Sequence, residues 1–272
     1  MAHGLEPVDF GPDENPSKHR THSCVTWRPL DNSFGAGVFT QARRFGYDQE
    51  ILEAFPSVRA GVIEASGLAN GSTPAELVAE YEVEQQSALE RLQATPISDL
   101  PSISAWRRAF TKFGAKPTHH RSAVESLLRR LTKQGAIPSI NTLVDVGNLV
   151  SIRYRLPVAV VDLSGIAGFI TVRVSDGTES FTDLGSEGSV NPEPGEVVFV
   201  DREKVASSRR WCWRQSQQSA TTASTTEAMF VIEGHHADAA SDIAAAIADL
   251  ARLLGKYQPQ AHTATYFLDG AA

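Results

Sequence analysis

Apolar residues recur every three or four positions in six segments of the chain. This spacing places them on one face of a helix. It predicts helices over residues 47–55, 74–92, 97–114, 122–134 and 241–255, and over a segment that begins after Asn141. Side chains that carry an oxygen precede four of these segments and are expected to cap their first turns: Thr73, Ser122 with Glu125, Asn141 and Ser241.

Short apolar runs rich in Val, Ile and Phe occupy much of the remaining chain. Runs of this length, bounded by Gly and Pro, are typical of strands. They predict strands over residues 57–68, 158–163, 168–174, 179–185, 196–201, 209–216 and 229–234. Together with the helices, these strands indicate an α+β fold.

The two ends of the chain lack this pattern. Residues 1–45 are rich in Pro, Gly, Asp, Asn and His, and we expect a loose arm that is ordered only where Trp27 or Phe39 docks. Residues 258–272 are expected to form a disordered tail. The remaining residues, 46–257, are predicted to be one domain, because a chain of 272 residues with 42% apolar residues can bury a full core.

Composition narrows the classes of function. No apolar run is long enough to span a bilayer, and the first residues lack the apolar segment of a secretory signal. Cys24 and Cys212 are the only cysteines, and their separation argues against a disulfide framework. Zinc-ligand spacings, a Gly-rich phosphate loop and a GxSxG elbow are all missing. We therefore expect a cytoplasmic protein with no metal, no cofactor and no membrane contact.

Residues 122–201 combine apolar elements with a few polar side chains. An unpaired polar group in such surroundings is costly, so it is either hydrogen-bonded or functional. For Asn148, the structural alternative to a functional role is a hydrogen bond to a neighbouring backbone group. For Arg173 and Glu179, the alternative is a cross-strand ion pair near the surface, at a hairpin turn. The candidates for a polar pocket are Asp145, Asn148, Asp162, Arg173 and Glu179.

Basic residues gather in one segment of an otherwise acidic chain. The net charge of −7 argues against a protein that coats nucleic acid indiscriminately. A local basic segment can nevertheless bind phosphates, or it can be a solvated face balanced by acids elsewhere in the fold. Arg129, Arg130 and Lys133 also suit the C-terminal end of a helix dipole, which is a structural reason for them to be basic. The candidates for contact with tRNA are Arg107, Arg108, Lys112, Arg121, Arg129, Arg130 and Lys133.

Three motifs resemble the B3/B4 domain of the phenylalanyl-tRNA synthetase β subunit. They read GAIPSINTLVDVGNLV, LPVAVVDL and ITVRVSDGTESFTDLG. The family has a helix that ends in Gly, VD-x-x-N, a Gln-Pro-x-His-x-Phe-Asp strand, and V-R-x-A-x-x-G-E before an LDG turn. Its Asn, Pro, Asp, Arg and Glu fall on Asn148, Pro157, Asp162, Arg173 and Glu179. The Thr-rich loop from Thr221 to Glu227 resembles the segment that closes the family's pocket.

The resemblance implies a β-sandwich core flanked by helices, with an editing site. In the synthetase this site hydrolyses the ester that joins a wrong amino acid to the 3′ end of a tRNA. Since no catalytic synthetase core is visible in this sequence, the resemblance implies a free-standing aminoacyl-tRNA deacylase that edits in trans. Substrate classes of the wider family include tyrosine on phenylalanine tRNA and, for free-standing members, the arginine analogue canavanine on arginine tRNA.

The resemblance also implies roles for residues. Glu179 and Asn148 are expected to be catalytic, Glu179 by holding the α-ammonium or the water and Asn148 by fixing the amino acid or the terminal adenosine. The expected substrate-binding residues are Asp162, Arg173, Gly177, Thr178, Thr221, Thr225 and Thr226, with backbone N–H groups stabilising the oxyanion. One departure matters: the family's His falls on Ala159, which opens space and favours a cationic substrate such as canavanine.

Two other classes of function fit the same residues. A non-catalytic tRNA-binding module would use the basic segment alone, and an amino-acid sensor would bind a free amino acid without tRNA. For the favoured function, the expected partner is aminoacylated tRNA. Neither DNA nor a membrane is an expected partner, and the protein is expected to be a monomer.

Overall fold

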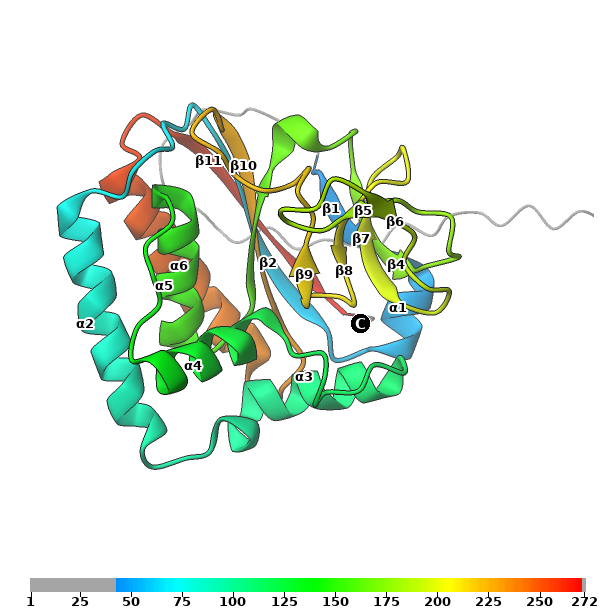
Figure 1. The fold of residues 1–272 in the computed structure, drawn as a ribbon, viewed down its shortest axis with the longest axis horizontal. Helices are drawn as coiled ribbons and strands as arrows, with labels where there is room; N and C mark the ends of the chain where they lie inside the picture. The colour runs from blue at the N-terminus through cyan, green and yellow to red at the C-terminus, as the bar shows by residue number, and fades with distance from the viewer. Residues whose placement is uncertain (1–42, 271–272) are drawn as a thin grey trace, which may run out of the picture.

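Two β-sheets stacked face to face form the centre of the structure, a computed structural model that describes residues 43–270 (Figure 1). One sheet has the strand order β11-β2-β10-β3, with bounds His262–Asp269, Arg59–Ser66, Glu227–Gly234 and Val158–Asp162. The other has the order β1-β4-β7-β8-β9, with bounds Phe45–Tyr47, Ile170–Val174, Val197–Val200, Ala206–Arg209 and Arg214–Gln215. A hairpin of β5 (Phe181–Thr182) and β6 (Ser189–Val190) lies beside the second sheet.

Six α-helices within residues 43–270 surround these sheets. Their bounds are Gln49–Ala54 (α1), Ala75–Leu92 (α2), Pro101–Lys112 (α3), Ala123–Gln134 (α4), Thr142–Tyr154 (α5) and Ala239–Tyr257 (α6). Short 3₁₀ turns span Ile97–Asp99 and Leu163–Gly165. α5 and α6 lie against the β11-β2-β10-β3 sheet, and α2 lies outside α5 (Figure 1). No helix in this part of the chain has both the length and the apolar character needed to cross a bilayer.

Strand β10 shows how one strand serves two layers. Alternate side chains of a strand point to opposite faces. Phe230 and Ile232 join the core under the helices, whereas Met229 and Val231 join the core between the sheets. Glu233 continues the second set, so its carboxylate points into the interior of the sandwich.

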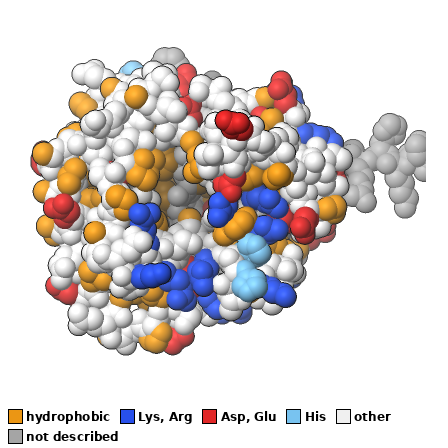
Figure 2. All heavy atoms as spheres, viewed as in Figure 1, with side chains coloured by type: hydrophobic (Ala, Val, Ile, Leu, Met, Phe, Trp, Pro, Cys, Tyr) orange, Lys and Arg blue, Asp and Glu red, His pale blue; other side chains and the backbone are white. Residues whose placement is uncertain are grey.

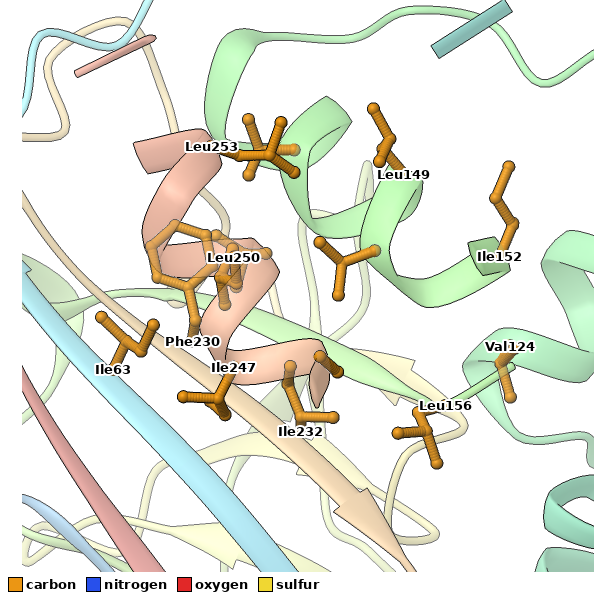
Figure 3. Close-up of a cluster of buried hydrophobic side chains, with 14 of the residues drawn as sticks. Ile63, Val124, Leu149, Ile152, Leu156, Phe230, Ile232, Ile247, Leu250 and Leu253 are labelled. Atoms are coloured by element: carbon orange, nitrogen blue, oxygen red, sulfur yellow. The ribbon is translucent and has the colours of Figure 1, made fainter. Parts of the chain in front are cut away.

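The helical core is close-packed. Leu149 of α5 and Leu250 of α6 are buried with Phe230 of β10 in one cluster (Figure 3). Full burial of such a side chain stabilises the fold by about 1.5–3 kcal/mol. Gly61 of β2 allows the close approach of α6, since a Cβ there would lie 2.5 Å from the Ile247 side chain.

The core between the sheets is rich in aromatic rings. Trp106 of α3 packs edge-on against Trp211, with 5.3 Å between ring centroids, and Phe55 meets Trp211 at 5.0 Å. α1 and α3 contribute Ile51 and Phe110 to the same cluster. These two helices therefore close one end of the sandwich.

The predicted fold class is confirmed: the protein is α+β, with a sandwich flanked by helices. The strand expected over residues 209–216 is wrong in detail, because the chain turns between β8 and β9. Arg210 and Trp211 take positive φ angles of 44° and 60° in this turn. These are unusual for residues with side chains, and a pattern of apolar residues does not reveal them.

Two expectations about helix starts also need correction. α2 begins at Ala75, and the Thr73 hydroxyl donates to Asp145 at 2.6 Å instead of capping it. α6 begins at Ala239, before the expected cap Ser241. By contrast, Ser122 and Asn141 do cap α4 and α5, accepting from Glu125 N and Val144 N.

The ends of the chain differ from expectation as well. Residues 262–269, expected to be part of a disordered tail, form β11 and pair with β2 along its length. The predicted arm of residues 1–45, with Trp27 and Phe39, lies almost wholly outside the described residues. Its last residue, Phe45, is fully buried in β1.

Candidate functional site

A cleft opens between the two sheets at their β3 and β9 edges. β3 and β10 form one wall, and β8, β9 and the turn between them form the other. The cleft has a volume of about 70 Å³, which is room for several waters, because one water needs about 10–15 Å³. Figure 2 shows a hollow near the centre of this face, between the helices and the β8-β9 edge. The lining includes Ala159, Cys212, Trp213, Gln215 and Glu233.

Glu233 is the carboxylate of this cleft. It is 2% exposed, and its Oε1 accepts hydrogen bonds from Tyr47 Oη at 2.6 Å and Trp211 Nε1 at 2.9 Å. Among the described residues, none donates a hydrogen bond to Oε2 and none forms an ion pair with the carboxylate. Oε2 is therefore the oxygen available to a ligand or a water.

The surroundings of Glu233 change its acidity. Burial raises its pKa to about 7, although the hydrogen bonds from Trp211 and Tyr47 oppose the rise. Burial also raises the pKa of Tyr47, to which the charge of Glu233 adds, so Tyr47 remains a neutral donor. A carboxyl group with a pKa near 7 can accept and donate a proton at neutral pH, as a general acid–base must.

The turn between β8 and β9 supplies one of the two donors to Glu233. Trp211 N donates to Val197 O at 2.6 Å, and the Ser208 hydroxyl donates to Arg214 O at 2.9 Å. These bonds fix a turn whose backbone is otherwise strained. The turn thus places the indole N–H of Trp211 on the Glu233 carboxylate.

Cys212 joins the cleft to the start of α4. Its carbonyl accepts from Ala123 N at 2.8 Å, and Ala123 also lines the cleft. Burial raises the pKa of the Cys212 thiol well above its usual value, and the charge of Glu233 adds to the rise. The thiol is therefore protonated at neutral pH and lacks the thiolate that a cysteine nucleophile needs.

Gln215 ties the two walls together. Its Nε2 donates to Val160 O at 2.7 Å and to Ser219 O at 2.8 Å. Trp213 lies beside it, with the guanidinium carbons of Arg210 and Arg214 at 5.0 and 4.8 Å from its ring centroid. Both guanidinium groups are also paired with carboxylates, Arg210 with Glu196 at 2.7 Å and Arg214 with Asp183 at 2.6 Å. The mouth of the cleft therefore offers an aromatic face for stacking, with the charges of these two arginines already balanced.

Three of the predicted tRNA-binding residues converge on one carboxylate. Arg107 and Arg129 approach Glu125 at 2.8 and 2.9 Å, and Arg121 lies 3.8 Å away. Glu125 is buried and does not reach back to the Ser122 N–H, as a full capping box would require. One carboxylate cannot neutralise three guanidinium groups, so this arginine cluster keeps a net positive charge close to Ala123 and the cleft.

The other predicted tRNA-binding residues lie on α3 and α4. Arg108 donates to the Ser104 hydroxyl at 2.9 Å, and Arg130 donates to Gln134 at 3.0 Å. Lys112 donates to a backbone carbonyl of α1, and Lys133 is exposed in the last turn of α4. In Figure 2, Lys and Arg side chains gather below the hollow and to its right.

The structure places Glu179 away from this cleft. Glu179 is fully buried just after the turn that follows β4, where Arg173 Nη2 lies 2.5 Å from Oε1 and the Ser175 hydroxyl donates to Oε2 at 2.6 Å. The Thr178 hydroxyl donates to Asp176, and Gly177 takes a φ of +83° that the turn requires. These contacts hold the turn together. The expected ion pair exists and its carboxylate is buried, but the expected hairpin does not form, because β4 pairs with β1 and β7 and β5 pairs with β6.

Asn148 belongs to a different layer. It lies half-buried on α5, beside the Tyr81 phenol of α2. The four-stranded sheet separates this helical layer from the turn between β4 and β5 that holds Glu179 (Figure 1). The structure therefore does not bring Asn148 and Glu179 together, which corrects the expectation of a shared catalytic cleft.

Asp162 and the Thr-rich loop form a third, separate network. The buried Asp162 accepts from the Thr225 hydroxyl and from Ser164 N, the latter at 2.9 Å. Thr221 contacts Asn141, the cap of α5, at 3.3 Å, and Thr226 is exposed. None of these residues lines the described cleft. Their hydrogen bonds anchor the loop between β9 and β10.

Glu233 is not among the site residues that the sequence predicts. Its only signal is one acid within the apolar run MFVIEG, a run that predicts a strand. A lone carboxylate on the buried face of a strand is a reason to look for a pocket. Ala159, which the sequence did single out, lines the same cleft.

The fold and the cleft define an α+β domain with a buried carboxyl group between two sheets, whose pKa is raised to about 7. The chain belongs to the B3/4 domain family, whose model matches residues 105–249. It is also similar to a solved N-terminal fragment of the phenylalanyl-tRNA synthetase β-subunit from Pyrococcus horikoshii, at 10% identity and a TM-score of 0.43 over 84% of this chain. That similarity spans 52% of the fragment, about half its length. No curated protein matches the chain.

Proposed function

We propose that the protein is an aminoacyl-tRNA deacylase and that the cleft at Glu233 is its active site. Membership of the B3/4 family supports the class of reaction. The observation that carries the proposal is a buried carboxylate that lines a cleft, with one oxygen held by two neutral donors and the other free of donors among the described residues. Glu233 and Trp211 take the place of Glu179 and Asn148 in the chemistry.

The reaction is ester hydrolysis. Water adds to the ester carbonyl carbon while Glu233 takes one of its protons through Oε2. The bond from that carbon to the ribose oxygen then breaks, and Glu233 returns the proton to the ribose oxygen. The products are a free amino acid and a tRNA with a free 3′ hydroxyl. General base catalysis of this kind contributes about 10²–10⁴-fold to the rate.

Tyr47 and Trp211 orient the base. Both donate to Oε1 and leave Oε2 directed to the reacting water. An ester is already activated, so positioning and proton transfer suffice without a covalent nucleophile. The neutral thiol of Cys212 is consistent with this route.

The arginine cluster of Arg107, Arg121 and Arg129 supports binding of tRNA phosphates next to the cleft. The Trp213 ring, with Arg210 and Arg214 over it, offers a stacking surface for the terminal adenosine. The positive charge of the arginine cluster near the cleft suits the anionic part of a ligand. The Glu233 carboxylate inside the cleft suits a cationic part. An aminoacylated 3′ end has this arrangement of charge.

The cleft also bears on the identity of the amino acid. Ala159 has a small side chain at the position where the resembling family has His, and it lines the wall opposite Trp213. Glu233 is the only acid among the described residues that line the cleft, so its charge attracts a cationic amino acid into the cleft while Oε2 itself stays with the reacting water. Canavanine on arginine tRNA is therefore the first substrate to test.

The test is a deacylation screen of the full-length protein on tRNAs charged with cognate, non-cognate and non-protein amino acids. We expect faster loss of the acyl group than in buffer for at least one misacylated tRNA. The cognate esters should remain intact. If every ester decays at the rate of the buffer control, the hydrolase proposal fails.

A non-catalytic tRNA-binding module is the second candidate, and the net charge of the arginine cluster favours it. This module would bind charged and uncharged tRNA equally. Arg129→Ala is expected to lower the affinity at low salt and to reduce the slope of log affinity against log salt by about 1. The hydrolase and the module share this result, so only the deacylation screen separates them.

A further inference from the structure

A second pocket lies where the turn after α1 meets α3. Its volume is about 180 Å³, and Phe55, Ser57, Arg108, Lys112 and His235 are among its lining residues. In the described part of the chain, the pocket and the cleft share no lining residue. This His235 pocket is thus a separate site.

His235 is the buried polar group of the pocket. The residue is 8% exposed, and its ring packs edge-on against Trp106 at 4.4 Å and Trp211 at 4.9 Å. Its Nε2 has no hydrogen-bond partner among the described residues. A buried ring nitrogen without a partner is costly, and a ligand that meets the ring in the pocket would remove that cost.

The imidazole of His235 is neutral. Burial lowers its pKa to about 3, and the nearby positive charges of His236 and Arg59 act in the same direction. A neutral imidazole carries one N–H donor and one acceptor nitrogen. It can therefore donate to an oxyanion while the charge comes from other residues.

Those other residues are Arg108 and Lys112. Both line the His235 pocket and also a shallow groove along α3, with a volume of about 470 Å³, to which Arg107 contributes. Among residues 43–270, no acidic side chain lines the pocket or the groove. Lys112 lies 5.1 Å from the centre of the Phe55 ring, which holds its ammonium group at the pocket.

We propose that the His235 pocket binds a phosphate group, with Arg108 and Lys112 at its mouth and the His235 N–H as the neutral donor. Two cations with no acid beside them select an anion, and Arg in particular matches the geometry of phosphate oxygens. The continuous groove along α3, which shares both cations, favours a backbone phosphate of RNA as the source. A free nucleotide or inorganic phosphate offers the same chemistry. The site does not require the cleft to hydrolyse anything.

The experiment follows the ring nitrogens of His235 by NMR in the full-length protein with ¹⁵N-labelled histidine. The resonances are assigned with His235→Gln. The three titrants are inorganic phosphate, adenosine monophosphate and a short single-stranded RNA, each compared with sodium chloride at matched ionic strength. We expect a saturable shift of the His235 signals with phosphate-bearing titrants. Arg108→Ala should weaken binding about tenfold or more, as loss of one charge-assisted hydrogen bond implies.

Arg91→Ala on α2 is the charge-matched control and should leave the titration unchanged. Arg108→Gln replaces Arg108→Ala if thermal unfolding shows that the alanine variant is not folded. Saturation at lower concentration with RNA than with free phosphate identifies the backbone as the source, and the reverse order identifies a free phosphate ligand. A shift that sodium chloride reproduces, or no saturable shift with any titrant in the wild-type protein, would overturn the proposal.

Discussion

Two buried glutamates of this protein have opposite surroundings. Glu179 is fully buried and meets the Arg173 guanidinium at 2.5 Å. Glu233 is almost equally buried but meets only neutral donors, the Tyr47 hydroxyl and the Trp211 indole. A cationic partner stabilises the charged form of a carboxylate, whereas burial without one favours the neutral form.

Burial alone therefore does not identify a carboxylate that can take part in acid–base chemistry. Glu179 fixes the turn between β4 and β5 through its ion pair and hydrogen bonds. Glu233 has a raised pKa, a free oxygen and a cleft beside it. The two residues should therefore respond in opposite ways when they are replaced.

The largest expected effect is on the proposed activity. Glu233→Gln keeps the volume and an oxygen acceptor but removes the base, so deacylation should fall by about 10²–10⁴-fold. Single-turnover decay of a misacylated tRNA measures it. Glu64→Gln is the matched control, because Glu64 is also buried on a strand, accepts from Tyr266 and Arg44 N, and lies outside the cleft. Equal rates for the two variants would remove Glu233 from the mechanism.

Replacing Glu179 should instead affect stability. Glu179→Ala leaves Arg173 without its partner and is expected to lower the free energy of unfolding by about 3–4 kcal/mol, the lower part of the range for buried pairs, because Arg173 is 22% exposed. Urea unfolding measures this loss. The deacylation rate per folded molecule should stay within about twofold of wild type. A stable but inactive Glu179→Ala protein would contradict the comparison.

The pH dependence of stability should report the surroundings of Glu233 directly. The pKa of Glu233 rises from 4.5 to about 7 on folding, so the folded state binds the proton more tightly than the unfolded state. Its contribution to stability is fully present below pH 4.5 and is lost as the pH rises through 7. The loss amounts to about 3 kcal/mol.

Unfolding of wild type and Glu233→Gln, each measured between pH 4.5 and 8, tests this sign. The wild-type protein should lose stability relative to the variant as the pH rises. Parallel curves would show that the pKa of Glu233 is not raised.

A smaller effect is expected from filling the cleft. Ala159→Leu adds bulk to the wall beside Glu233, and kcat/KM for a large aminoacyl group should fall about tenfold. Ala264→Leu, at an exposed position of β11, is the control and should not change kcat/KM. If the cleft does not bind the amino acid, both variants will behave like wild type.

Local signals explain which parts of the structure could be predicted from the sequence. Ser122, Gly135 and Asn141 delimit α4 and α5 because capping and left-handed glycine geometry depend on neighbouring residues. The alternation in β10 likewise follows from its own side chains. Both kinds of signal are contained in short segments of the chain.

The site depends on distant residues, and this is why it could not be predicted. Tyr47 lies 186 residues from Glu233 in the sequence, and only the stacking of the two sheets brings them together. Trp211 reaches Glu233 because a residue with a side chain adopts a positive φ in the β8-β9 turn. Ala159 was singled out through its resemblance to a motif, but the carboxylate beside it had no motif.

The measurement that tests the account most directly follows the side-chain carboxyl carbons of Glu233 and Glu179 by NMR. The protein is titrated with a non-hydrolysable amide analogue of an aminoacylated adenosine whose amino acid is the one that the deacylation screen identifies. The account predicts that the Glu233 signal shifts and saturates while the Glu179 signal stays in place. A saturable shift of Glu179 without any change at Glu233 would contradict it.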